Sequence, residues 1–257
     1  MNADHINHFA GIIPARYASS RFPGKPLALI GNKPMIQRVY EQARKSLELV
    51  YVATDDERIF NSVTGFGGKA VMTSPDHFSG TDRCAEAIAM ILSETDRKID
   101  IVVNIQGDEP FIRPEQLTLL MNCFNSQEVE LATLIRKVEV DEDIFNPNQP
   151  KVIVNALGNA IYFSRSVVPF VRDADKNEWT MKHTFYKHIG LYAYRTETLG
   201  RITRLLHSPL EIAESLEQNR WIENGYQIRT AVTEWESIGI DTPEDLEKAN
   251  LILDHFI

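Results

Sequence analysis

Residues 9–26 read FAGIIPARYASSRFPGKP, and they set the beginning of the fold. The apolar run at 9–15 has the length of a strand, and the loop that follows to Pro26 is rich in Gly, Pro and Ser. Small loop residues let backbone N–H groups approach phosphate oxygens, and Arg16, Arg21 and Lys25 add positive charge. The loop is neither a P-loop nor a G-x-G-x-x-G fingerprint. We interpret it as a phosphate-binding loop; the alternative is an ordinary strand-to-helix loop with solvated cations.

The charge distribution agrees with a small anionic ligand. Residues 5–40 contain no Asp or Glu, although acidic residues make up 36 of the 257 in the chain. The net charge of −9 argues against nucleic acid as the main partner, because a phosphate backbone requires a basic face. A locally cationic segment in an acidic protein favours a small polyanion site instead.

Strand-sized apolar runs alternate with segments of helical period through the first half of the chain. Strands are expected at 9–15, 49–54, 69–73 and 101–106, and helices at 35–47, 55–65 and 81–92. This order predicts an α/β fold with a mostly parallel central sheet flanked by helices, and ligands bound beyond the carboxyl ends of the strands.

The second half changes character. The pattern predicts a hairpin at 151–156 and 160–165 around a Leu-Gly-Asn turn, a surface loop at 172–183, strands at 188–195 and 227–233, and helices at 211–224 and 243–256. Thr242 is the expected N-cap of the last helix. We expect one domain over 1–257 with an antiparallel excursion at about 150–200.

Targeting and redox features are sparse. The N-terminus has no basic stretch followed by an apolar run, and the longest apolar runs are far too short to span a membrane. We therefore expect a cytoplasmic protein with no membrane partner. The two cysteines, Cys84 and Cys123, are expected to be reduced thiols rather than a disulfide or part of a zinc site.

Two carboxylates lie where a metal ion could be held. Asp108, in QGDEP at 106–110, directly follows the fourth expected strand, and Asp241 precedes the terminal helix. Such oxygens could hold Mg²⁺ that bridges phosphates; the alternative for each is a role in capping the next turn. Arg83, in SGTDR, falls in the first turn of a helix, where a cation is disfavoured. That position hints at an anionic ligand; otherwise Arg83 is a solvated surface residue.

Taken in order, these stretches resemble one family over nearly the whole chain. The resemblance rests on IIPARYASSRFPGKPL, KPMI, VATDDERI, MTSPDHFSGTDR, VNIQGDEPFI, FNPNQPKVIV, YFSRSVVPF, HIGLYAYR, SPLEIAESLEQNR and GIDTPEDLEKAN. The family is that of the 3-deoxy-manno-octulosonate cytidylyltransferases, or CMP-Kdo synthetases. The chain departs from the family pattern at Phe22, where Leu is frequent, and around 172–183.

The resemblance implies a Rossmann-like nucleotidyltransferase fold, Mg²⁺ as cofactor, and a homodimer formed largely through the excursion. It also implies that CTP and the acidic sugar Kdo give CMP-Kdo and pyrophosphate, for lipopolysaccharide synthesis. Arg16, Lys25 and Asp108 would be catalytic, the two cations neutralising the β- and γ-phosphates, and Asp108 and Asp241 would hold the metal. Nucleotide-binding residues would be Ala15, Arg16, Ser19, Arg21, Lys25 and Gln106. Sugar-binding candidates are Arg83, Gln106, Arg165, His188, Tyr192 and Gln218; His188 and Tyr192 could instead be core residues of a strand.

Other functions remain as alternatives. A CMP-sialate synthetase would share the first loop, but the blocks after residue 150 favour Kdo, or a close analogue such as its 8-amino derivative. A sugar-1-phosphate nucleotidyltransferase would show G-x-G-T-R-L-x-P-x-T, and a glycosyltransferase an Asp-x-Asp motif at the fourth strand; neither is present. A catalytically silent nucleotide-binding module should lack one of Arg16, Lys25, Asp108 and Asp241, and all four are present.

Overall fold

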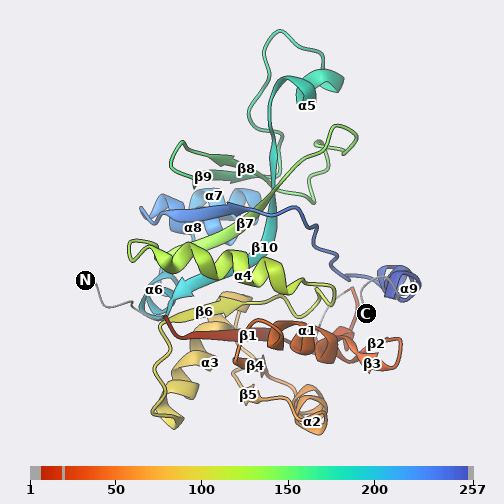
Figure 1. The fold of residues 1–257 in the computed structure, drawn as a ribbon, viewed down its shortest axis with the longest axis vertical. Helices are drawn as coiled ribbons and strands as arrows, with labels where there is room; N and C mark the ends of the chain where they lie inside the picture. The colour runs from red at the N-terminus through yellow and green to blue at the C-terminus, as the bar shows by residue number, and fades with distance from the viewer. Residues whose placement is uncertain (1–6, 19–20, 254–257) are drawn as a thin grey trace.

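The computed structural model describes residues 7–18 and 21–253. A nine-stranded sheet forms the centre, in the order β5-β4-β1-β6-β10-β7-β11-β9-β8 (Figure 1). In chain order the strands are β1 (Phe9–Ala15), β4 (Leu49–Thr54), β5 (Ala70–Met72), β6 (Ile101–Asn104), β7 (Leu131–Lys137), β8 (Lys151–Val154), β9 (Asn159–Ser164), β10 (Tyr186–Arg195) and β11 (Ile228–Val232). The bounds predicted for the first two of these, at 9–15 and 49–54, are confirmed.

The first half of the sheet is parallel. β1 lies between β4 and β6 and runs parallel to both, and β4 pairs in parallel with β5. The carboxyl ends of these four strands therefore meet at one edge of the sheet. This edge receives the loop after β1 and the residues after β6, as the sequence predicted.

The second half is mixed, and here the expectation of a mostly parallel sheet needs correction. β10 runs antiparallel to β6, β7 and β8, and β11 is parallel to β7 but antiparallel to β9. The predicted hairpin is present as β8 and β9, and its strands belong to the main sheet. The prediction of parallel pairing rests on the strand–helix alternation of the first half. The second half lacks this alternation, and an apolar run alone does not identify the neighbouring strand, so its pairing could not be predicted.

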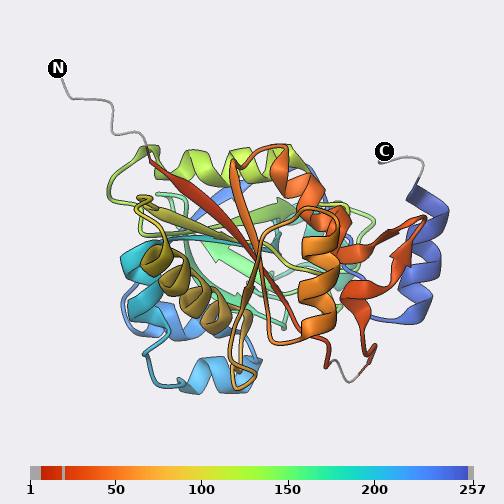
Figure 2. The same cartoon turned by 90° about the horizontal axis from the view of Figure 1, so that it is seen from below.

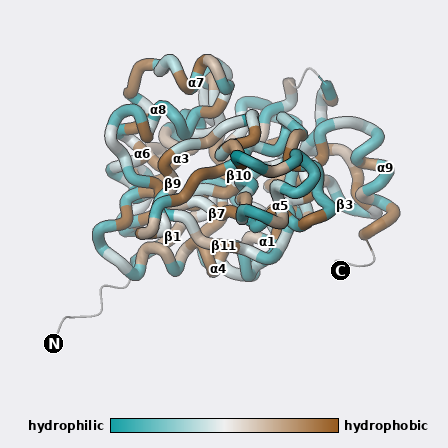
Figure 3. Tube along the Cα trace, turned by 90° about the horizontal axis from the view of Figure 1, so that it is seen from above, coloured by the Kyte–Doolittle hydropathy of each residue, from teal (hydrophilic) through white to brown (hydrophobic). Residues whose placement is uncertain are grey.

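Helices cover both faces of the sheet (Figure 2). One apolar cluster packs α1 (Met35–Arg44), α2 (Glu57–Gly65) and α4 (Pro114–Asn122) on one face. A second cluster packs α3 (Gly80–Glu94), α6 (Thr196–Ile202) and α8 (Glu217–Glu223) on the other. Hydrophobic stretches gather in the central strands, between more polar outer loops (Figure 3). This arrangement confirms the predicted α/β fold.

The helix expected at 211–224 is wrong as a single helix. The chain forms α7 (Pro209–Glu214) and α8, separated at Ser215, whose φ of 51° is left-handed. Arg165 stabilises the break, because its Nε donates to the carbonyl of Glu214 (2.7 Å) and its Nη2 to that of Ser215 (3.3 Å). These carbonyls would otherwise lack the intrahelical partners that a continuous helix supplies.

The segment expected to be a plain surface loop at 172–183 contains a short helix, α5 (Trp179–Lys182). Trp179 is buried in a small apolar cluster of its own with Val138, Ile144 and Phe185. Figure 1 shows α5 at the end of an arm that projects from the sheet. The segment around Trp179 is mostly polar, so its composition did not predict a buried residue.

The end of the chain folds back onto the loop after β1. α9 (Pro243–Ile252) begins at the expected N-cap Thr242, whose hydroxyl accepts from the N–H of Asp245. Ile240 and Ala249 pack with residues of the small β2–β3 hairpin region (Leu29–Ile30 and Lys33–Pro34) and α1. Within the described residues no helix is both long and apolar enough to cross a membrane.

Candidate nucleotide site

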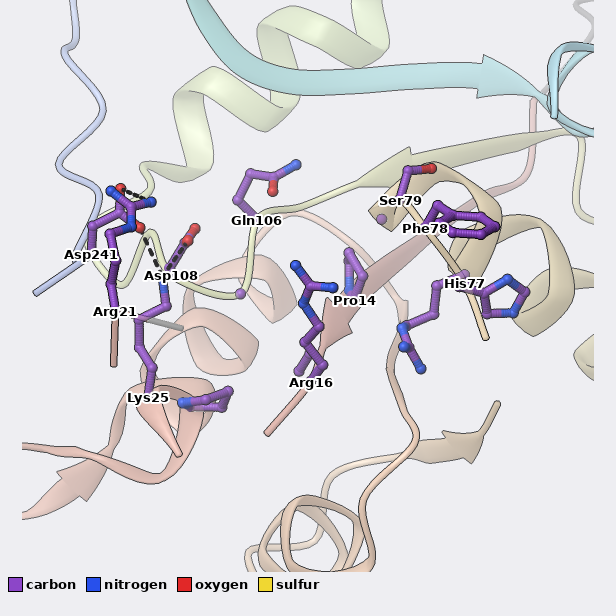
Figure 4. A pocket seen from close by; sticks show the side chains of 15 residues that line it. Pro14, Arg16, Arg21, Lys25, His77, Phe78, Ser79, Gln106, Asp108 and Asp241 are labelled. Carbon is purple, nitrogen blue, oxygen red and sulfur yellow. Dashed lines mark hydrogen bonds and ion pairs between the residues drawn. The ribbon is translucent and has the colours of Figure 1, made fainter. Parts of the chain in front are cut away.

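A cavity of about 270 Å³ lies at the carboxyl edge of the parallel strands (Figure 4). It brings together eight of the predicted site residues: Ala15, Arg16, Arg21, Lys25, Arg83, Gln106, Asp108 and Asp241. Figure 4 shows Arg21, Lys25, Asp108 and Asp241 at one end and His77, Phe78 and Ser79 on the opposite wall. Ser19, another predicted nucleotide-binding residue, lies outside the described residues.

At the cavity, the turn after β6 and the end of β1 come close together because Gly107, between Gln106 and Asp108, has no side chain. A Cβ added to Gly107 would lie 2.9 Å from the carbonyl oxygen of Pro14, well inside normal contact. Glycine therefore lets the turn after β6 lie directly against the end of β1. Arg16, the next residue but one after Pro14, is exposed at the cavity and forms no ion pair within the part of the chain that the structure describes. Its charge is available to a ligand.

Lys25 lies between the two predicted metal ligands. Its Nζ is 2.7 Å from Asp108 Oδ2 and 3.1 Å from Asp241 Oδ1, and its side chain is only 12% exposed. Arg21 pairs with the other oxygen of Asp241, at 3.1 Å. The two carboxylates meet because Ile240 donates its N–H to the carbonyl of Asp108 (2.9 Å), which joins the segment before α9 to the turn after β6.

The pair of carboxylates suits a magnesium ion. The ammonium group of Lys25 occupies the space between them, so a cation is accommodated there. Among the described residues, no group of three or more Asp, Glu, His or Cys side chains could hold a metal ion. A metal ion at the two carboxylates would therefore need further ligands. Oxygen donors of this type, completed by water and phosphate, match the coordination that Mg²⁺ prefers.

Arg83 has an internal partner that its sequence position did not reveal. Its guanidinium donates to Asp55 (2.9 Å) and to the hydroxyl of Thr73 (2.6 Å), and the residue is only 3% exposed. Asp55 follows the end of β4 and so reaches the first turn of α3 across the edge of the sheet. The unfavourable position of Arg83 in the helix dipole is thus offset by Asp55, and Arg83 forms part of the cavity wall.

The remaining four sugar-side candidates, Arg165, His188, Tyr192 and Gln218, do not line this cavity. The His188 ring contacts Phe163 and Tyr192 at centroid distances of 5.2 and 5.1 Å, and its Nε2 lies 3.1 Å from the Thr133 hydroxyl. Burial lowers the pKa of His188 to about 3, which keeps the ring neutral near neutral pH.

Strand β10, which carries His188 and Tyr192, nevertheless passes close to the cavity. A Cβ at Gly190 of β10 would lie 3.8 Å from Gln106 Cγ, so the strand that carries His188 and Tyr192 passes next to the cavity wall. In the same region three buried polar atoms have no hydrogen-bond partner among the described residues: Asn104 Oδ1, Gln218 Nε2 and Trp221 Nε1. Unsatisfied buried polar atoms are costly, and a polyhydroxylated ligand could supply their partners.

Known proteins resemble this chain throughout its length. The cytidylyltransferase family model matches residues 10–232. A 3-deoxy-manno-octulosonate cytidylyltransferase from Parabacteroides distasonis is 58% identical over 94% of this chain and 96% of its own. The chain is a 3-deoxy-manno-octulosonate cytidylyltransferase family member.

Two further relatives bear on the site of this cytidylyltransferase. A solved structure of CMP:2-keto-3-deoxy-manno-octonic acid synthetase complexed with CTP is 42% identical, with a TM-score of 0.86 over 98% of this chain and all of that one. An 8-amino-3,8-dideoxy-manno-octulosonate cytidylyltransferase from a Shewanella species is 48% identical over 92% of this chain and 95% of its own.

Sequence reasoning missed two carboxylates of this cytidylyltransferase, of which Glu109 is buried and Glu217 is partly buried. Glu217, at the start of α8, accepts hydrogen bonds from Ser79 (3.1 Å) and Thr81 (2.5 Å) in the first turn of α3. Glu109 accepts from Ser237 (2.9 Å), and burial together with neighbouring Asp108 raises its pKa to about 7. Each stands beside a residue that was singled out, Gln218 and Asp108, but only the folded chain shows what it contacts.

Proposed function

We propose that this enzyme transfers CMP from CTP to the anomeric hydroxyl of Kdo. The hydroxyl oxygen attacks the α-phosphorus, the bond to the β-phosphate breaks, pyrophosphate leaves and the hydroxyl proton is lost. The observation that carries the proposal is the cavity in which three cations of the first loop meet two carboxylates from distant segments. The relatives named for this reaction support it. Because CTP is a cytoplasmic substrate, we place the reaction in the cytoplasm, where CMP-Kdo would serve lipopolysaccharide synthesis.

We assign the triphosphate to the cationic end of the cavity. Arg16 and Lys25 neutralise the β- and γ-phosphates and so stabilise pyrophosphate as it leaves; Arg21 adds charge at the same end. Asp108 and Asp241 would hold Mg²⁺, which supplies positive charge to the reacting phosphate oxygens when bound. The contribution of the chain is mostly positioning and electrostatic stabilisation, as in other phosphoryl-group transfers.

We place the sugar beyond Gln106, along β10. Neutral His188 and the hydroxyl of Tyr192 can hydrogen-bond sugar hydroxyls, and the unsatisfied amide of Gln218 supports a polar ligand at this position. We assign the sugar carboxylate to Arg83, which lines the cavity, because Arg165 lies outside it and donates its hydrogen bonds to backbone carbonyls.

Pyrophosphate release tests the function directly. With Mg²⁺ and CTP, we expect release with Kdo and none without an acidic sugar. The 8-amino derivative is the second candidate, because relatives named for it are 48% identical to this chain; N-acetylneuraminate tests the sialate alternative. Release with a different acid would retain the mechanism and revise the sugar pocket. No release from folded protein would contradict the proposed function.

We propose a homodimer formed through the segment around α5, which projects from the sheet. Phe170 and Met181 are 73% and 62% exposed, and the Phe170 ring contacts buried Trp179 at a centroid distance of 5.1 Å. Exposed apolar groups around one buried anchor are typical of a protein interface. Phe170→Glu should shift the enzyme from dimer to monomer in sedimentation equilibrium, whereas Leu251→Glu, at an equally exposed position on α9, should not. A Phe170→Glu variant that stays dimeric would contradict this interface.

A further inference from the structure

The sequence block VATDDERI, at residues 52–59, has no role in the chemistry described so far, although it ends at the same edge of the sheet as the cavity. Its two consecutive aspartates pair with arginines of two different helices, α3 and α2. Asp55 pairs with Arg83 of α3, at 2.9 Å. Asp56 turns to the opposite side, toward the loop after β1.

Asp56 holds Arg58 in a fixed orientation. Its carboxylate accepts from Arg58 Nε (3.0 Å) and Nη2 (2.6 Å), a two-point contact that fixes the plane of the guanidinium. The same carboxylate caps α2 by accepting from the backbone N–H of Arg58 (2.9 Å). The first turn of α2 and the guanidinium are therefore set by one side chain.

The guanidinium of Arg58 lies over the ring of Tyr17, in the loop after β1. Its Cζ is 3.3 Å from the centroid of the Tyr17 ring, within the range of a cation–π contact. The same ring lies against Gly24: a Cβ added there would be 2.9 Å from Tyr17 Cζ, and Gly24 has a left-handed φ of 73°. The Gly24 N–H also donates to the Tyr17 carbonyl, at 2.9 Å.

These contacts fix the spacing of the two phosphate-binding cations. Arg16 directly precedes Tyr17 and Lys25 directly follows Gly24, so the contact between Tyr17 and Gly24 brings the two cations to the base of one loop. We propose that Asp56 and Arg58 act as positioning residues, which hold Tyr17 against Gly24 and so preset Arg16 and Lys25 for the triphosphate. The proposal rests on the proposed function and adds to it a set of residues that touch no substrate.

A preset loop should act on binding more than on the chemical step. If the loop adopts the competent arrangement only part of the time, apparent CTP affinity falls by that fraction, while bound CTP restores the arrangement. The Arg58→Met and Tyr17→Leu variants should therefore raise the Kd and KM for CTP by roughly three- to tenfold, with kcat at saturating CTP within about twofold of the parent enzyme. Asp56→Asn, which keeps a good helix cap, should have the same effect.

Matched variants separate this role from a general loss of stability. Tyr17→Phe keeps the ring and should behave as the parent enzyme. Arg97→Met removes an exposed cation paired with Glu48 (3.5 Å) far from the cavity edge, and should leave CTP affinity unchanged. The Arg58→Met/Tyr17→Leu double variant should be no worse than the more affected single variant, because both remove the same contact.

Hydrogen exchange gives a readout that does not depend on turnover. Without nucleotide, the Gly24 amide should exchange faster in Arg58→Met than in the parent enzyme, and CTP should abolish the difference. Unchanged CTP affinity and unchanged Gly24 exchange in Arg58→Met would overturn the proposal, as would a fall in kcat without a rise in KM. If the parent enzyme released no pyrophosphate with any acid, the proposed function would fail, while Gly24 exchange would still decide whether Arg58 holds the loop.

Discussion

Asp108→Ala and Asp241→Ala are each expected to lower the rate of pyrophosphate release by about 10³-fold or more while leaving the fold intact. Each carboxylate provides half of the oxygen pair that would hold Mg²⁺, and the side chains lie at the cavity, 34% and 46% exposed, rather than in the core. The hydrogen bond that joins the segment before α9 to the turn after β6 is accepted by the backbone carbonyl of Asp108, which the substitution leaves in place. The loss should therefore come from charge at the reacting phosphate.

The measurement is pyrophosphate release from CTP and Kdo as the Mg²⁺ concentration is raised, with circular dichroism and thermal unfolding to follow the fold. Glu244→Ala is the matched control, because it removes an acid from the first turn of α9 without touching the pair. Asp108→Asn and Asp241→Asn, which keep the side-chain shape, should be nearly as inactive as the alanine variants. A variant that retained most of its activity with normal Mg²⁺ dependence would show that its carboxylate is not a metal ligand.

The order of motifs along the chain was enough to predict the edge of the sheet at which the cavity lies. β1 and β4 are continuous apolar runs bounded by turn residues, so their limits are local properties. Asp108 follows such a run, which places its carboxylate beyond a strand end. The meeting of Asp108 with Asp241 could be expected from the resemblance, but neither segment reveals it by itself, because a backbone hydrogen bond between distant parts of the chain creates it.

Long-range contacts explain what the sequence could not predict. The ion pair that buries Arg83 could not be predicted, because its partner, Asp55, comes from a different strand end. The break between α7 and α8 depends on Arg165, which reaches the carbonyls of Glu214 and Ser215 from the end of β9. The apolar residues of α7 do not reveal the break either, because Leu210 and Ile212 are 38% and 67% exposed and only Glu211 of this helix is buried. In both cases the deciding contact is made by a side chain whose partner is remote in the chain.

Lys25→Gln should raise the affinity for a divalent metal ion and at the same time lower the rate of pyrophosphate release. Lys25 is proposed to neutralise the triphosphate, yet in this structure its ammonium group lies between Asp108 and Asp241. Arg21 also pairs with Asp241, so the two carboxylates are already neutralised by two cations before a nucleotide arrives. When CTP draws Lys25 toward its phosphates, the carboxylates become available to the metal, so nucleotide and metal should assist one another in binding.

The variant should consequently bind Mn²⁺, used as a probe, roughly tenfold more tightly than the parent enzyme when no nucleotide is present, because the competing charge is gone. Its pyrophosphate release should nevertheless fall by about 10²- to 10³-fold, since a charge that stabilises the leaving group is missing. Mn²⁺ binding is measured by calorimetry or electron paramagnetic resonance, with Lys33→Gln as control, because Lys33 pairs with Glu41 (2.8 Å) outside the cavity. Equal Mn²⁺ affinity in Lys25→Gln and parent enzyme would show that the ammonium group does not compete for the carboxylates. Retained turnover would remove Lys25 from the triphosphate site.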